Sequence, residues 1–136
     1  MAASDYLEQR VLDFVLRAAA EHSFTAPTTV YVALFTTATT DAGGGTEVAN
    51  SGAYARTAVT FGAIGAATDG IISNSAEVAF PQATASWGTI THIAIVDSNT
   101  YGAGNFLFHG ALTASKTVDT NDTFKIAIGD LDITLS

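Results

Sequence analysis

Histidines are the first residues of this chain whose side chains could do acid–base or metal chemistry. His22, His92 and His109 lie far apart in the sequence, so only the fold could bring two of them together. His92 alternates with hydrophobic neighbours as on a strand, and His109 is expected on the strand face opposite Phe106, Phe108 and Leu112. Packing is the favoured role for these histidines, with a metal ligand or a general base as the alternative.

Oxygen-bearing side chains form one pattern that resembles a cation site. Asp97–Gly102 begins like a calcium loop, with oxygen donors at the first and third places and glycine at the sixth. The match fails at the fifth place and at the twelfth, Phe108, where a bidentate glutamate belongs. We therefore expect a plain turn here. The acids of 119–122, and Asp130 with Asp132, could collect a cation, but a solvated turn and strand face explain them equally well. No metal site is assigned.

The glycine-rich segments do not match nucleotide-binding motifs. Gly43–Gly45 lacks the Gly-Lys-Ser/Thr ending of a phosphate loop, and Gly102–Gly104 lacks the third glycine of a dinucleotide fingerprint. The sequence contains no Gly-x-Ser-x-Gly elbow and no cysteine, which excludes thiolate catalysis and thiolate metal sites. We predict no catalytic residue, no cofactor and no enzymatic activity.

Arg56 is the only arginine beyond the N-terminal segment, and it follows Tyr54 closely. One interpretation is a rim residue that pairs with an acid of the preceding loop, Asp41 or Glu47. The other is an ion pair between subunits. Trp87, the single tryptophan, is expected to be a core or interface anchor near one end of a sheet.

The element that precedes these residues is a predicted amphipathic helix over residues 5–21. Its hydrophobic residues recur at helical spacing along one face: Leu7, Val11, Phe14, Val15 and Ala18. Asp5 and Glu8 form a possible capping box, with Ser4 as the competing N-cap. The hydrophobic face must be buried against the body or a partner.

The rest of the chain has the pattern of a β protein. Val30–Phe35 is hydrophobic on both faces, and a long glycine loop follows over residues 37–53, expected to be mobile or docked on a neighbour. The further strands predicted are 54–61, 71–80, 89–96, 106–112, 123–128 and 131–135. Seven or eight antiparallel strands of this length predict a β-sandwich over 28–135, jelly-roll or Greek-key-like, in a mainly β domain spanning 1–136.

Composition and charge bound the partners. The chain is 48% hydrophobic but only 13% charged, so much of its surface is neutral threonine, alanine and glycine, which favours contact with another protein. The net charge of −8 argues against binding nucleic acid. No segment approaches the length of a membrane span, so no membrane is expected as a partner. We expect association with copies of itself, as a homodimer or homotrimer.

Several short motifs, in order, resemble a family of small bacteriophage structural proteins described as tail-fibre-like or capsid decoration proteins. They are 32–36 (VALFT), 41–47 (DAGGGTE), 54–56 (YAR), 59–61 (VTF), 72–74 (ISN), 80–84 (FPQAT), 87–92 (WGTITH), 110–112 (GAL) and 115–118 (SKTV). The resemblance implies a virion component without catalysis, assembled in the cytoplasm of a bacterial host.

Within that resemblance, the compact acidic module favours a decoration protein that binds the outer face of the head and cements the major capsid protein. The alternatives are a tail or baseplate adaptor or tail-fibre protein, and a carbohydrate-binding tip in which exposed Trp87, Tyr54 or Tyr101 would line a groove. The residues expected to contact partners are Leu7, Val11, Phe14, Asp41, Gly43, Gly44, Gly45, Glu47, Tyr54, Arg56 and Trp87.

Overall fold

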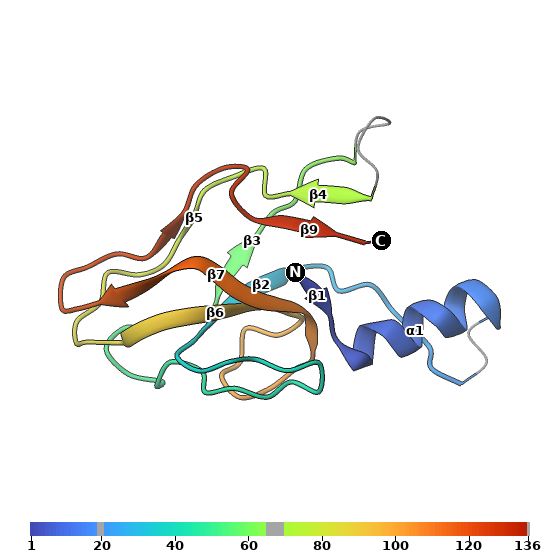
Figure 1. Ribbon diagram of the computed structural model, residues 1–136, viewed down its shortest axis with the longest axis horizontal. Coiled ribbons are helices and arrows are strands. Elements are labelled where there is room, and N and C mark those ends of the chain that lie inside the picture. Colours follow the sequence, from blue (N-terminus) through green and yellow to red (C-terminus); the bar gives the residue numbers. More distant parts are fainter. Residues whose placement is uncertain (19–20, 65–69, 136) are drawn as a thin grey trace.

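The computed structural model describes residues 1–18, 21–64 and 70–135, and it is built mainly of antiparallel strands (Figure 1). One sheet has five strands in the order β1-β7-β6-β2-β3. Their bounds are Ala2–Ala3 for β1, Phe106–Val118 for β7, Gly88–Val96 for β6, Val30–Phe35 for β2 and Thr57–Val59 for β3. The long hairpin of β6 and β7 forms its centre.

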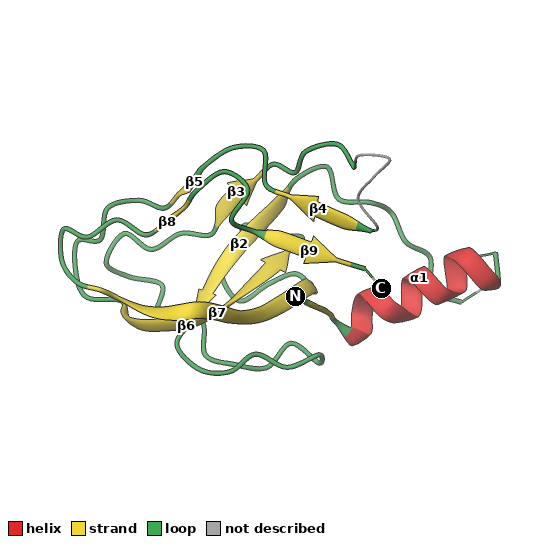
Figure 2. Ribbon diagram, turned by 45° about the horizontal axis from the view of Figure 1, so that its top comes forward, coloured by secondary structure: helices red, strands yellow, loops and turns green. Residues whose placement is uncertain are grey.

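Two short ribbons form the opposite layer. β4 (Ile71–Ser73) pairs with β9 (Asp132–Thr134), and β5 (Val78–Ala79) pairs with β8 (Lys125–Ile126). Both ribbons lie on the same side of the five-stranded sheet in the two views (Figures 1 and 2). The mainly β, antiparallel sandwich predicted from the sequence is therefore confirmed, with the second layer split into two ribbons.

The main core lies between these layers. Leu34, Ile93 and Ile95 from the sheet face Phe80 and Ile133 from the ribbon side, all with less than a tenth of their surface exposed. Such side chains each give roughly 1.5–3 kcal/mol on burial, so this layer contact supplies much of the stability. A smaller cluster lies on the other face of the sheet, around Ala33, Phe35, Ala94 and Val96. Because both faces of β2 are covered, its two-sided hydrophobic pattern is explained.

The N-terminal helix is shorter than predicted. α1 spans Asp5–Leu16, and its N-cap is Ser4, whose hydroxyl accepts a hydrogen bond from the amide of Leu7 at 3.2 Å. The Asp5 alternative is thus wrong, because Ser4 holds the extended backbone of a cap. Residue 17 already leaves helical geometry, so the prediction of helix to residue 21 is also wrong, and residues 19–20 lie outside the described part of the chain.

Strand boundaries differ from prediction where side-chain periodicity is weak. β7 continues six residues past the predicted end at residue 112, and β1 was not predicted at all because two alanines carry no pattern. Residues 65–69 of the predicted sandwich lie outside the described residues. Within the described ranges, no helix is long and hydrophobic enough to cross a membrane.

Candidate functional site

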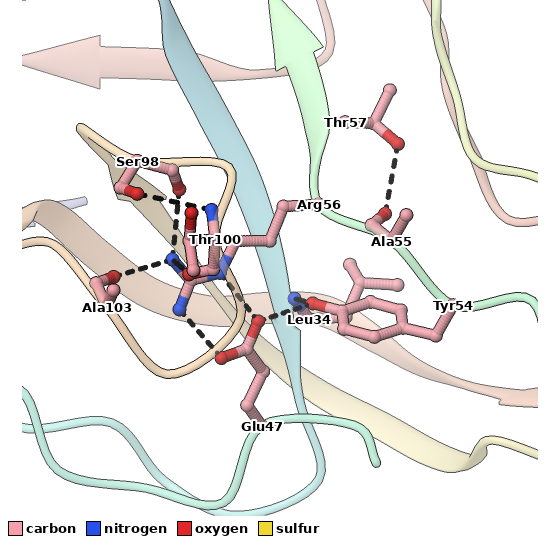
Figure 3. Close-up of polar contacts among 9 residues, drawn as sticks. All are labelled: Leu34, Glu47, Tyr54, Ala55, Arg56, Thr57, Ser98, Thr100 and Ala103. Carbon is pink, nitrogen blue, oxygen red and sulfur yellow. Dashed lines mark hydrogen bonds and ion pairs between the residues drawn. The ribbon is translucent and has the colours of Figure 1, made fainter. Parts of the chain in front are cut away.

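A buried ion pair between Arg56 and Glu47 is the most highly connected polar group of the described structure (Figure 3). Arg56 donates through Nε to Glu47 Oε1 and through Nη2 to Oε2, both at 2.8 Å. The two side chains are only 3% and 9% exposed. This bidentate geometry is the strongest form of arginine–carboxylate pairing. The hydrogen bonds with Glu47 raise the pKa of Arg56 further, so its charge is permanent.

The third nitrogen of the same guanidinium, Nη1, binds carbonyl oxygens of the loop between β6 and β7. Nη1 lies 2.9 Å from the carbonyl oxygens of Ser98 and Thr100 and 2.7 Å from that of Ala103. Figure 3 shows these three carbonyls pointing at one nitrogen. They belong to the segment that resembles a calcium loop in sequence. The carbonyl oxygens converge on a cation, and that cation is Arg56.

The carboxylate of Asp97, at the start of this loop, also accepts hydrogen bonds from within the loop. Asp97 accepts hydrogen bonds from the amide of Asn105 at 2.7 Å and from its side-chain Nδ2 at 3.0 Å. The loop is therefore cross-braced at its two ends by Asp97 and in its middle by Arg56. The prediction of a turn between two strands is confirmed.

Glu47 is positioned by the return of the preceding loop onto β2. The amide of Thr36 donates to the carbonyl of Thr46, and the amide of Val48 donates to the carbonyl of Leu34, both at 2.9 Å. Gly45 suits the reversal, because a side chain would be strained at its φ of +102° and the carbonyl of Ala38 lies only 3.0 Å from the position of a Cβ. The long glycine loop is thus folded against its own strand.

Tyr54 connects this ion pair to the core. Its hydroxyl donates to Glu47 Oε1 at 2.8 Å and accepts from the amide of Leu34 at 3.1 Å. Burial raises the pKa of the Tyr54 phenol well above its usual range, because ionisation would place a second negative charge beside Glu47 without water. The phenol therefore stays a neutral donor. Three segments, 34–35, 47–56 and 98–103, are joined through one connected network.

Of the two alternatives for Arg56, the structure contains the internal pair, and its partner is Glu47 rather than Asp41. Asp41 instead lies 2.8 Å from Nε2 of His109, whose Nδ1 lies 2.8 Å from the hydroxyl of Thr39. His109 is buried, pairs with Ala94 and packs beside Phe106, so the prediction of opposite faces is wrong for Phe106, whereas Phe108 and Leu112 pack against the main core on the other face of the sheet. A register shift near Ile95 reverses the alternation there.

Trp87 is an internal anchor. It is 6% exposed, its indole Nε1 donates to the carbonyl of Gly52 at 2.8 Å, and its ring meets Tyr54 edge to face at 5.4 Å. Tyr54 is also buried. A sugar-binding groove lined by these two rings is therefore wrong, because neither has a free face. Tyr101 is 41% exposed and lines a shallow pocket of about 240 Å³ with Gly43 and residues of the ion pair.

A second group of ionisable side chains lies at the end of α1. Asp13, Glu21 and His22 place ligand atoms within 4.8 Å of one another. Arg17 already lies between the acids, 3.1 Å from Asp13 and 3.0 Å from Glu21, and His22 donates its amide to Asp13 at 2.8 Å. The hydrogen bond with His22 lowers the pKa of Asp13. The arrangement fastens the segment after α1 back onto the helix, and we assign it no metal.

The predicted partner-contact residues separate into three groups. Glu47, Tyr54, Arg56 and Trp87 are brought together, but in the interior, and Leu7 is buried beneath α1. Of the loop residues, Gly43 and Gly45 line the pocket beside the ion pair, Gly44 is half-buried, and Asp41 is exposed beside His109. Val11 is half-buried and Phe14 is 64% exposed on α1. Partner contact stays a prediction for the exposed members. The backbone carbonyl oxygens that bind Arg56 could not be predicted from the sequence, because no residue type marks them.

The amino-acid sequence was compared with curated proteins and with models of protein families. Curated proteins include no match to the chain. A family model does match, over residues 2–134, and its description is podophage GP4 fiber I protein gp80. The match covers the helix, both layers and the Arg56–Glu47 network. The chain therefore belongs to this family of phage fibre proteins.

Proposed function

We propose that this protein is a fibre subunit of a short-tailed phage and that it acts as a rigid, non-catalytic structural module. The observation that carries the proposal is the family match across residues 2–134, which includes every described helix and strand. The tail-fibre role, an alternative at the level of sequence, accordingly takes precedence over capsid decoration.

The internal bracing suits a part that transmits force rather than one that opens and closes. The Arg56 network ties the 36–50 loop and the 97–104 loop to the same face of the five-stranded sheet. A buried ion pair whose partners come from separate segments resists local opening, since opening leaves a charge without a partner. Long loops that are fixed in this way hold the outline of the module constant.

The described ionisable groups also favour a passive role. His109 is engaged by Asp41 and Thr39, and His22 by Asp13. Each histidine is used to fasten a loop or a chain segment, and neither faces one of the larger hydrophobic cavities. The chemistry of these groups supports fastening of segments, without substrate turnover.

Capsid decoration is the second candidate, because the described body is compact and has no shaft. In that role the acidic sandwich would cover seams between copies of the major capsid protein on the outer surface of the head. Each copy would add a modest interface, and many copies together would stabilise the shell.

Copy number in purified particles distinguishes the two. Quantitative mass spectrometry against the major capsid protein should give on the order of a dozen copies for a fibre on a symmetric tail, whereas a decoration protein would reach hundreds. Gold-labelled antibody should mark the tail end of the particle. Label spread over the head at high copy number would overturn the fibre assignment, and absence of the protein from particles would overturn both.

A further inference from the structure

The second half of α1 presents a hydrophobic face that the rest of the described chain leaves exposed. Leu12, Val15 and Leu16 lie together on one side of the helix and are 58%, 67% and 73% exposed, while Phe14, 64% exposed, lies on the far side from Leu12 and Leu16. The first turns of the helix rest on the body through Leu7, with Tyr6 and Val11 packed against the same core, and the last turns extend beyond the sheet (Figures 1 and 2). We call Leu12, Val15 and Leu16 the α1 ridge.

A hydrophobic groove lies directly beside the α1 ridge. It has a volume of about 560 Å³ and runs between α1, the N-terminal strand and the end of β9. Its hydrophobic walls include Met1, Ala3, Val11, Phe108 and Leu135. Leu135 is itself 59% exposed at the rim. We call this feature the terminal groove, since residues from both ends of the described chain line it.

The ridge and the rim of the groove together form a surface of the size used in protein association. At roughly 100 Å² of exposed hydrophobic area per residue, the three ridge residues and Leu135 present about 400 Å² before the groove walls are counted. The largest patch on a typical monomer is about 300–600 Å² and is often functional, and a stable interface covers about 800 Å² per partner. The exposed residues and the groove walls together therefore offer the area of a modest interface.

We infer that the occupant is a second copy of this chain, with the α1 ridge of one copy in the terminal groove of the next. The ridge residues stand at positions i, i+3 and i+4 of the helix, as in Leu12, Val15 and Leu16, which is the spacing of helix-in-groove recognition. One chain carries both the ridge and the groove, so copies are complementary to each other without any further partner.

The root of the ridge is fixed, which lowers the entropic cost of this contact. The hydroxyl of Ser4 donates to the carbonyl of Phe106, the amide of Ser4 donates to that of Leu107 at 3.0 Å, and the amide of Asp5 donates to that of Asp41 at 3.0 Å. The helix therefore leaves the body at a set angle, and its exposed residues are preorganised for docking.

The net charge of the chain predicts how this self-association responds to salt. Each copy carries a net charge of −8, and Glu8 is the one charged side chain among the described residues that line the groove. Hydrophobic burial thus acts against repulsion between like-charged copies. Because salt screens that repulsion, self-association should strengthen as salt concentration rises, which is opposite to the response of an interface made by ion pairs.

The test is the mass of the full chain in solution, measured by sedimentation equilibrium from about 1 to 100 µM, the range suited to an interface near the lower size limit. The wild type should self-associate, and more strongly at high salt. Val15→Glu should weaken association on the order of 30-fold, the loss typical of an interface hot spot. Glutamate is a good helix former, so α1 persists, and circular dichroism checks this.

Ile128→Glu is the matched control. Ile128 is 66% exposed, almost the same as Val15, but it lies in the turn after β8 and does not line the groove. This variant should associate like the wild type. Equal loss of association in both variants would show a nonspecific effect of hydrophobicity and charge, and would overturn the inference.

Cross-linking provides a second readout that identifies the contact. The chain has no cysteine, so Val15→Cys and Leu135→Cys proteins can each carry one thiol. On mixing under oxidising conditions, they should form a mixed disulfide faster than Ile128→Cys does with either. A wild type that stays monomeric over the whole range, or cross-linking without preference for the mixed pair, would refute docking of ridge into groove. The inference does not depend on where the protein sits in the virion, since the test uses free protein.

Discussion

Replacing Arg56 by methionine tests whether the Arg56–Glu47 pair holds the loop face together. The substitution keeps an unbranched hydrophobic stem but removes the guanidinium, and it leaves the Glu47 carboxylate, 9% exposed, with the Tyr54 hydroxyl as its remaining donor in the network. Breaking one half of a buried pair costs about 3–5 kcal/mol. The three loop carbonyls also lose their donor, but they lie on an exposed loop where water replaces it, so we expect a total of about 4 kcal/mol.

Urea unfolding followed by fluorescence measures this loss, because Trp87 is the single tryptophan and lies edge to face with Tyr54. The melting temperature should fall by about 12 °C for a chain of this size. Lys125→Met is the control: Lys125 and its partner Glu77 are 55% and 50% exposed, and an exposed ion pair contributes at most about 1 kcal/mol.

A double-mutant cycle with Glu47→Gln separates the pair from packing effects. The coupling energy between positions 47 and 56 should reach about 2–3 kcal/mol, since the groups share two direct hydrogen bonds. Additivity within about 0.5 kcal/mol, or a loss below about 1 kcal/mol for Arg56→Met alone, would refute the reasoning.

Three further perturbations follow from the same geometry. Burial raises the pKa of Tyr54, so its stabilising effect is present below the unfolded pKa of about 10 and is lost as pH rises above it; Tyr54→Phe should remove the last component of an ultraviolet titration of the tyrosines. The hydrogen bond with His22 lowers the pKa of Asp13 from 3.8, so the stabilisation by the Asp13 carboxylate is present above pH 3.8 and is lost as the pH falls below it. Asp13→Asn should therefore make the free energy of unfolding less dependent on pH in acid. His22→Ala should have the same effect, because it removes the hydrogen bond that lowers the pKa. Gly45→Ala should cost more than Gly102→Ala in melting experiments, by about 1–2 kcal/mol, because both have positive φ but only Gly45 has a carbonyl 3.0 Å from the Cβ position; equal losses would contradict a steric cause.

Elements with strong periodicity were predictable from the sequence. Val30–Phe35 was predicted with its observed bounds, because every residue of the strand is hydrophobic and both faces are covered. β7 was cut short at residue 112, since its last residues are mostly threonine, serine and lysine and pair without a buried pattern. The helix was extended too far, because the hydrophobic spacing continues through Ala18 while the backbone at Arg17 already departs from the helix.

The candidate site was predictable only in part. The sequence predicts an acidic partner for Arg56 in the glycine-rich loop over residues 37–53. It does not distinguish Asp41 from Glu47, because both lie in this loop and neither has a periodic pattern around it. The choice depends on the pairing of Glu47 with Phe35, which is a tertiary contact. The carbonyl oxygens of the 98–103 loop were beyond reach of sequence, since every residue carries a carbonyl and only backbone geometry selects three of them.

The guanidinium within the 98–103 loop has a consequence for a particle that must persist outside a cell. Calcium-binding loops are held by an ion that is lost on dilution into fresh water or to a chelator. Here the positive charge is covalently attached through the chain, 2.7–2.9 Å from its carbonyls, so its local concentration does not depend on the medium. The loop keeps its shape in water of any mineral content.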